Sequence, residues 1–232
     1  IQNMAAFFLT GTDTSIGKTT VACALLQAAN QQGLTTLGIK PIASGCEQTP
    51  DGLRNSDALL LQQYSSLKLP YQEVNPIALL EPLSPHLAAK NAGRRLTMNQ
   101  LVGYTRATLT HRPQFAIIEG AGGWRVPISD REMLSSLPKE LKVPVILVVG
   151  MRLGCLNHAL LTAEAIIRDG LRLAGWVANT IDPTMAALEE NIQTLKQIIP
   201  APCLGVLPYQ TTPNIEALAE CMNLEVLLTK PA

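Results

Sequence analysis

Gly11-Thr12-Asp13-Thr14-Ser15-Ile16-Gly17-Lys18-Thr19 follows the apolar run 6–9 and opens a segment rich in Ala and Leu. Glycine lets successive backbone N–H groups turn towards one anion, and the N-terminus of a helix adds partial positive charge. A lysine after the second glycine can reach the β- and γ-phosphates of a nucleotide, and the hydroxyl after it can ligate Mg²⁺. The pattern therefore predicts a strand, a phosphate-binding loop and a helix, with Lys18 on phosphate and Thr19 on metal.

The spacing of this loop departs from the usual one by a single residue. Five residues rather than four separate Gly11 from Gly17, so Thr12 occupies the position of the first glycine. An ordinary strand-to-helix turn with a surface lysine is the competing interpretation. The apolar strand before the loop and the helical pattern after it favour phosphate binding.

Strand-length apolar runs alternate with helical patterns along the rest of the chain. The runs are continuous, as in parallel strands covered on both faces, and lie at 36–39, 115–118, 145–149, 174–178 and 203–207. Helical patterns occupy 19–32, 56–63, 97–110, 157–169 and 186–198. This alternation predicts an α/β fold of three layers, with a mostly parallel central sheet and helices on both faces. The polar stretch 46–55 is predicted to be a mobile loop.

Length and composition exclude several classes of protein. The 232 residues favour one α/β domain, 1–232, with residues 1–3 before Met4 set outside the fold. Basic and acidic residues balance at 18 each, which argues against nucleic acid or an anionic membrane as partner. No segment reaches the ~20 apolar residues that span a bilayer. Five cysteines without a Cys-x-x-Cys pair argue against disulfides or zinc and favour the cytoplasm.

Polar residues follow the predicted strands at the edge where parallel sheets bind ligands. Lys40 and Ser44 come after 36–39, Glu119 comes directly after 115–118, and Asp57 begins a predicted helix. A surface lysine and an ordinary helix-start aspartate are the plainer interpretations of Lys40 and Asp57. Glu119 favours a metal-binding role, because a carboxylate at the end of a buried strand is costly without a partner. Together, Thr19, Asp57 and Glu119 offer the hard oxygen ligands that Mg²⁺ prefers.

Residues after the later strands are candidates for binding the rest of a ligand. Asn179 follows 174–178, and its amide can donate to and accept from adenine, although a turn residue is the plainer interpretation. Pro208 and Tyr209 follow 203–207 and can flank the same base. Free N–H groups at the helix start from Gly154 to Asn157 can hold a carboxylate. Cys155 is interpreted as a small packed residue, since no activating partner is evident.

The ordered set of motifs resembles that of the dethiobiotin synthetases and covers most of the chain. The first matches are Gly-Thr-Asp-Thr-x-x-Gly-Lys-Thr at 11–19, Lys-Pro-Ile-Ala-Ser-Gly at 40–45, Gly-Leu-Arg-Asn-Ser-Asp at 52–57 and Asn-Pro-Ile-Ala at 75–78. They continue with Ser-Pro-His at 84–86, Glu-Gly-Ala-Gly-Gly-Trp at 119–124, Val-Ile-Leu-Val-Val-Gly at 145–150, Leu-Gly-Cys-Leu-Asn-His at 153–158 and Gly-Trp-Val-Ala-Asn at 175–179. The opening motif alone is shared with related proteins, whereas the whole set is specific.

This resemblance implies a homodimer of P-loop NTPase-like fold that converts 7,8-diaminononanoate, CO₂ and ATP to dethiobiotin, with Mg²⁺ on Thr19, Asp57 and Glu119. The implied catalytic residues are Lys18, Lys40, Thr14 and Ser44. The implied nucleotide contacts are Asp13, Thr14, Ser15, Ile16, Gly17, Lys18, Thr19, Thr20, Asp57, Glu119, Gly122, Asn179, Pro208 and Tyr209. Substrate contacts are Ser44, Gly122 and, across the dimer, Gly154, Cys155, Leu156 and Asn157.

Three positions depart from the family pattern and keep alternatives open. Ser15 stands where the family is often acidic, Asn191 where some members have an aromatic residue, and 131–136 lacks the expected aromatic-acidic pattern. One alternative is a paralogue that acts on a different substrate. Another is a ParA/MinD-like ATPase switch, although the additional loop lysine and the basic or amphipathic surface of such switches are not evident.

Overall fold

The computed structural model describes residues 4–229, and its central strand, β1 (Ala5–Gly11), leads into the phosphate loop. Successive side chains of a strand point to opposite faces of the sheet. Phe8 packs into the apolar cluster on one face, and Phe7 and Leu9 pack into the cluster on the other. The strand is therefore continuously apolar because both of its faces are covered. Residues 1–3, which were set outside the fold, lie outside the described residues.

Within residues 4–229, six parallel strands form the central sheet in the order β10-β9-β8-β1-β7-β2. The other five strands are β2 (Thr36–Ile39), β7 (Phe115–Glu119), β8 (Val145–Met151), β9 (Leu173–Thr180) and β10 (Cys203–Leu207). Each corresponds to an apolar run in the sequence, so the predicted parallel sheet is confirmed. All six carboxyl ends meet at one edge.

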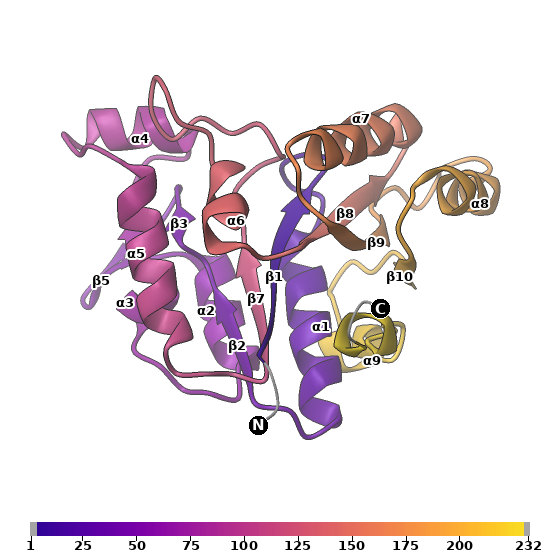
Figure 1. Cartoon of the computed structure of the whole chain (residues 1–232), viewed down its shortest axis with the longest axis horizontal. Coiled ribbons are helices and arrows are strands. Elements are labelled where there is room, and N and C mark those ends of the chain that lie inside the picture. The colour runs from indigo at the N-terminus through magenta and orange to yellow at the C-terminus, as the bar shows by residue number, and fades with distance from the viewer. Residues whose placement is uncertain (1–3, 230–232) are drawn as a thin grey trace.

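Helices cover both faces of the sheet (Figure 1). The face that carries Phe7 is covered by α1 (Lys18–Gln31), α2 (Ser56–Tyr64), α3 (Tyr71–Val74), α9 (Ile215–Ala219) and α10 (Glu225–Leu228). The face that carries Phe8 is covered by α4 (Pro85–Asn91), α5 (Met98–Leu109), α6 (Ser136–Leu141), α7 (Cys155–Arg168) and α8 (Leu188–Ile198). The predicted three layers are confirmed, and no described helix is long and apolar enough to cross a membrane.

Local chemistry sets where the helices begin. Asn55 caps α2 by accepting from Ala58 N, and Thr97 forms a capping box with Gln100 at the start of α5. Helix α7 begins two residues before its predicted start, because Gly154 adopts φ 94° and lets the chain enter the helix at Cys155. Helix α8 begins later than predicted, since Ala187 lies in the left-handed region at φ 54°.

The prediction of a loop at 46–55 is wrong. This stretch forms an antiparallel hairpin of β4 (Glu47–Thr49) and β5 (Gly52–Arg54). Pro50 and Asp51 form the turn, Gly52 has φ 99°, and Thr49 Oγ1 donates to Gly52 O at 2.7 Å. A Pro-Asp-Gly turn thus closes a polar hairpin whose strands lack an apolar pattern. Two short parallel strands, β3 (Ile42–Ala43) and β6 (Ile77–Ala78), also escaped the sequence prediction.

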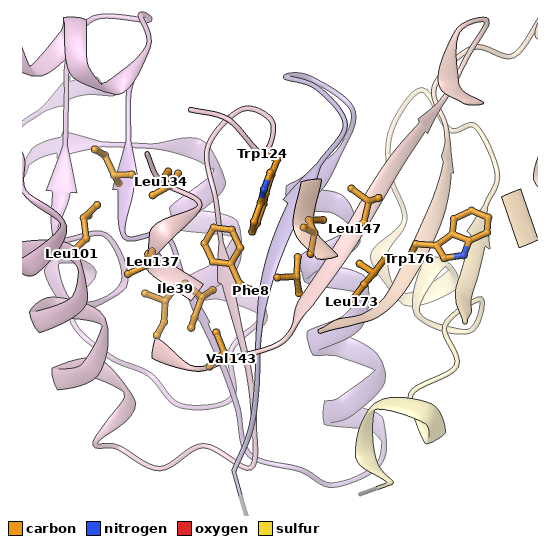
Figure 2. Packing of buried hydrophobic residues seen from close by; sticks show 14 of the residues in the cluster. Phe8, Ile39, Leu101, Trp124, Leu134, Leu137, Val143, Leu147, Leu173 and Trp176 are labelled. Atoms are coloured by element: carbon orange, nitrogen blue, oxygen red, sulfur yellow. The ribbon is translucent and has the colours of Figure 1, made fainter. Parts of the chain in front are cut away.

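The glycine run after β7 ends on a buried anchor. Trp124 meets Phe8 edge-on, with ring centroids 6.3 Å apart (Figure 2), and its indole N–H donates to Asp169 Oδ2 at 2.9 Å. Arg125 donates to both oxygens of the same carboxylate, at 2.6 and 2.8 Å. Asp169 is the C-cap of α7, so the glycine run is tied to the end of that helix. The hydrogen bonds from Arg125 are the main cause that lowers the pKa of Asp169 below 3.8.

We expect Asp169→Asn to lower the free energy of unfolding by about 1 kcal/mol at neutral pH, because it removes the charge that pairs with Arg125. The loss is no larger because the half-exposed Arg125 is partly screened by solvent. A carboxyl group whose pKa is lowered by folding contributes stability above its unfolded pKa and loses it as the pH falls through the folded value. The difference between wild type and variant should therefore shrink below pH 3.8. Urea denaturation at neutral and acidic pH measures it, with exposed Glu164→Gln as control. An equal difference at both pH values would contradict the pairing.

Candidate active site

The carboxyl ends of β1, β2 and β7 and the segments that follow them meet around one cavity of about 380 Å³. Its lining combines the phosphate loop with polar groups from distant segments. Eleven predicted site residues line it: Thr14, Ser15, Gly17, Lys18, Thr19, Thr20, Lys40, Ser44, Asp57, Glu119 and Gly122. The convergence of these residues on one cavity follows from the parallel sheet, because the loops after its strands share one edge.

The backbone of the phosphate loop explains its unusual spacing. Gly17 has φ 82° and Ser15 has φ 57°, so the left-handed positions fall in the second half of the loop. Thr12 is not among the residues with positive φ, which is why a threonine is tolerated where the usual loop has glycine. The Thr12 backbone N–H donates to Val148 O at 3.0 Å, and its hydroxyl accepts from Gly150 N at 3.4 Å. Thr12 therefore fastens the loop to β8.

Lys18 is a buried cation, and no carboxylate of residues 4–229 contacts its ammonium. Its ammonium donates to the carbonyl oxygen of Asp13 at 2.7 Å and lines the cavity. Burial, with a smaller contribution from the nearby charge of Lys40, lowers the pKa of Lys18 from 10.5 to about 8. A group placed in this way gains most from a bound anion, because phosphate oxygens would supply the missing negative charge.

Binding of ATP should therefore take up protons at a pH between 8 and 10.5, because the phosphates would restore the charge of Lys18. Isothermal titration calorimetry in two buffers with different ionisation enthalpies measures this uptake. We expect most of one proton per ATP in this pH range and much less at neutral pH, where the lysine is already charged. Lys18→Met should abolish the uptake. Equal proton uptake by wild type and variant would refute the role of this lysine.

Lys40 lies at the centre of a buried ionic cluster. Its ammonium contacts Glu119 Oε1 at 2.6 Å, Asp57 Oδ2 at 3.3 Å and the Gly120 carbonyl oxygen at 3.1 Å. Lys40 and Glu119 are only 4% and 1% exposed. Burial alone would lower the pKa of Lys40, but the two carboxylates outweigh it and raise the pKa above the ordinary value. The lysine therefore stays charged beside the phosphate loop.

The same cluster offers oxygen ligands of the kind that Mg²⁺ prefers. Thr19 Oγ1 donates to Glu119 Oε1 at 2.9 Å, and Asp57 lines the same cavity. Glu119 Oε2 is buried and has no hydrogen-bond partner within the part of the chain that the structure describes. Among residues 4–229, no group of three or more His, Cys, Asp and Glu side chains gathers as a metal site. Two carboxylates and a hydroxyl suit an ion that takes its remaining ligands from phosphate and water.

A second cavity, of about 210 Å³, adjoins the first at the phosphate loop. Both are lined by Ser15, Gly17 and Thr20, and the second is also lined by Asn179, Pro208 and Tyr209. Asn179 Nδ2 donates to Ile16 O at 2.7 Å. A Cβ atom at Gly17 would lie 2.3 Å from that nitrogen, so only glycine fits there. Asn179 thus supports the loop as well as lining the cavity, a role that the sequence did not reveal.

Other predicted residues lie outside both cavities. The Asp13 carboxylate pairs with Arg152 at 2.6 Å, and the Ile16 side chain is buried beneath the loop. Gly154 and Asn157 are exposed at the start of α7 and line neither cavity. Leu156 is partly buried, and Cys155 is buried, as expected for a packed residue. Within one chain, the start of α7 therefore lies outside the lining of both cavities.

Some residues that line the cavities were missed by the sequence analysis. Ala43, Asn55, Leu60 and Ala121 line the first, and Thr180, Ile181, Gln210, Pro213 and Leu218 line the second. Asn55 and Ala121 are neighbours of predicted residues in matching motifs, so the motifs themselves could have indicated them. Leu60 lies one turn after Asp57 on α2, and only the packing of that helix indicates its position.

Comparison with known proteins decides the family. A family model described as an AAA domain matches residues 5–216. The ATP-dependent dethiobiotin synthetase BioD of Cellvibrio japonicus is 54% identical over 223 residues, which are 96% of this chain and 97% of that protein. The BioD of Pseudomonas aeruginosa is 54% identical over 224 residues, 97% of this chain and 98% of that protein. The chain belongs to the dethiobiotin synthetase family. The resemblance noted in its motifs is thereby confirmed.

Solved structures place this dethiobiotin synthetase family member among the P-loop NTPase folds. One chain of the MinC–MinD cell division complex of Aquifex aeolicus aligns with a TM-score of 0.56 at 14% identity, covering 89% of this chain and 82% of that chain. The signal recognition particle receptor FtsY of Elizabethkingia anophelis aligns with a TM-score of 0.52 at 12% identity, covering 99% and 67%. At such low identities the likeness shows the fold alone, and it agrees with the predicted fold class.

Proposed function

We propose that the protein closes the ureido ring of dethiobiotin from 7,8-diaminononanoate, CO₂ and ATP, releasing ADP and phosphate. The observation that carries this proposal is the convergence of Lys18, Lys40, Thr19, Asp57 and Glu119 on one cavity. A triphosphate needs that combination of buried cations, hydroxyl and carboxylates. The 54% identity to dethiobiotin synthetases over nearly the full chain supports this substrate over that of a diverged paralogue.

The proposed reaction has three steps. One amine of the diamine adds to CO₂ through a new C–N bond, gives up a proton and forms a carbamate. A carbamate oxygen attacks the γ-phosphorus of ATP, so that a C–O–P mixed anhydride forms and ADP leaves. The second amine then attacks the carbamate carbon, the new C–N bond closes the ring, phosphate leaves and the amine gives up its proton. Phosphoryl transfer of this kind depends on alignment and charge neutralisation.

The side chains of the cavity supply these requirements. Lys18 and Lys40, which line the same cavity, would neutralise oxygens of the γ-phosphate and the carbamate. Thr14 would lie beside the transferring group, and Ser44 and Gly122 would hold the carbamate or an amine. Thr19, Asp57 and Glu119 would hold Mg²⁺, which supplies further neutralisation of the triphosphate when bound. Asp13 and Ile16 would contact the nucleotide through their backbone, since their side chains lie outside the cavity.

The remaining contacts complete the proposed assignment. Adenine would lie in the second cavity, against Asn179, Pro208 and Tyr209. The start of α7, from Gly154 to Asn157, would meet the carboxylate of the diamine from the partner subunit of a homodimer in the cytoplasm. Leu153 is 93% exposed and Leu161 is 58% exposed, which supports an interface on this part of α7.

A mass-spectrometric assay for dethiobiotin tests the function directly. Purified protein is given ATP, Mg²⁺, bicarbonate and the diamine, and each component is omitted in turn. We expect dethiobiotin and ADP in equal amounts only when all are present. ATP turnover that ignores the diamine would refute this substrate and would favour an ATPase switch instead.

A further inference from the structure

The segment around the Asn-Pro-Ile-Ala motif at 75–78 lies next to the site but lines neither cavity. Asn75 is the C-cap of the short helix α3 and is 2% exposed. Its Nδ2 donates to the backbone carbonyl of Lys40 at 2.7 Å and to that of Ile77 at 3.3 Å. The backbone N–H of Lys40 donates to Val74 O at 2.8 Å. Both backbone groups of Lys40 are therefore held by one turn of chain.

Tyr71 extends this arrangement to the helix that carries Asp57. Its hydroxyl donates to Asn75 Oδ1 at 2.9 Å and accepts from the backbone N–H of Asn55 at 2.7 Å. Asn55 is the N-cap of α2, two residues before Asp57. The guanidinium of Arg54 lies over the Tyr71 ring, 4.3 Å from its centroid. The tyrosine is thus clamped between the hairpin that ends at Arg54 and the first turn of α2.

These contacts close a ring through the active site. From Asp57 the ring passes through Asn55, Tyr71 and Asn75 to the backbone of Lys40, and it returns through the Lys40 ammonium to the Asp57 carboxylate at 3.3 Å. The three linking residues are buried, so the loss of one bond leaves its partners without water to replace it. Such a ring fixes the separation of its two active-site members.

We propose that Tyr71 and Asn75 are positioning residues that hold Lys40 and Asp57 in the arrangement required by Mg²⁺ and ATP. This inference rests on the nucleotide site of the proposed function. Metal-free ATP would be held mainly by the phosphate loop and Lys18, and of the ring only Lys40 would reach its γ-phosphate. Lys40, by contrast, pairs with both Asp57 and Glu119, the two carboxylates that would hold the metal. A loosened ring should therefore weaken the contribution of Mg²⁺ more than the binding of ATP alone.

Tyr71→Phe tests the proposal, because it removes both hydroxyl hydrogen bonds and retains the ring under Arg54. Calorimetry measures ATP affinity with excess Mg²⁺ and with a chelator. Partners behind metal ligands contribute about 10- to 100-fold to metal affinity. We expect the Mg²⁺-dependent gain in ATP affinity to fall about tenfold, while metal-free binding stays within about twofold. The matched control is Tyr64→Phe, since that hydroxyl makes no hydrogen bond among the described residues and should behave as wild type.

Two results would overturn the proposal: an unchanged Mg²⁺ gain in folded Tyr71→Phe, or an equal loss with and without metal, which indicates general loosening. Should that variant not fold, Arg54→Met carries the test, because Arg54 is only partly buried and its loss should not prevent folding. In Arg54→Met we expect the Mg²⁺-dependent gain in ATP affinity to fall about threefold. An unchanged gain there would again refute the ring. Wild type that binds no ATP would overturn site and ring together. Wild type that binds ATP and Mg²⁺ but makes no dethiobiotin would refute only the substrate, and the ring would still be judged by calorimetry.

Discussion

Lys18→Met should reduce ATP turnover about 10³-fold, because it removes a preorganised charge that would stabilise the transition state of phosphoryl transfer. The same change should leave the folded protein at least as stable as the wild type. Burial lowers the pKa of Lys18 to about 8, so holding this lysine charged costs folding free energy at neutral pH. Methionine retains the apolar stem that packs against Gly11 and removes that cost.

Turnover and thermal unfolding, measured on the same preparation, test this expectation. Lys68→Met is a suitable control, because Lys68 is exposed and its ammonium donates to the backbone carbonyls of Gln62 and Gln63 at the end of α2. A variant that loses activity only because it unfolds would contradict the assignment, as would one with full turnover. Calorimetry should also show weakened ATP binding, since the lysine would contact phosphate before reaction.

Lys40→Met should abolish turnover to a similar extent and also destabilise the protein. Here the lysine neutralises Glu119, which is 1% exposed. Its removal leaves a buried carboxylate to which, among the described residues, only Thr19 donates. Breaking one partner of a buried ion pair typically costs about 3–5 kcal/mol. For a chain of this size, a loss of 3 kcal/mol lowers the melting temperature by roughly 6–12 °C.

The double variant Lys40→Met/Glu119→Gln separates the two effects. A neutral amide no longer needs the cation, so most of the lost stability should return, while turnover should remain as low as in Lys40→Met. Thermal unfolding and ADP release measure both quantities. Double-variant stability no better than that of Lys40→Met would show that the cost arises from packing rather than from the unpaired carboxylate.

The central sheet could be predicted because each of its strands coincides with an apolar run in the sequence. The apolar runs at 36–39 and 203–207 coincide with β2 and β10, since strands that pack against helices on both faces have few polar residues. The pairs β3–β6 and β4–β5 were missed for the opposite reason. Ile42 and Ala43 form too short a run to stand out, and the hairpin at Glu47 to Arg54 is polar on both sides. Its stability depends on a turn and on contacts such as that between Arg54 and Tyr71.

The site was predictable to the extent that its residues follow strands of one parallel sheet. Lys40 and Glu119 could be placed together because β2 and β7 are parallel neighbours. Contacts made through side chains from unrelated segments were not predictable. Asn179 supports the phosphate loop across 163 residues of chain, and Arg152 pairs with Asp13 across 139. No local pattern encodes such pairs, because they depend on how the two segments pack.

The order of the strands also bears on synthesis of the protein. β1 pairs with residues 115–119 on one side and with residues 145–148 on the other, so neither neighbour exists when the phosphate loop first leaves the ribosome. Pairing between such distant segments is slow, and the unpaired apolar strand is exposed to misassociation until both arrive. A nascent chain should therefore gain affinity for ATP only after β8 has emerged, and a chaperone would be most useful before then.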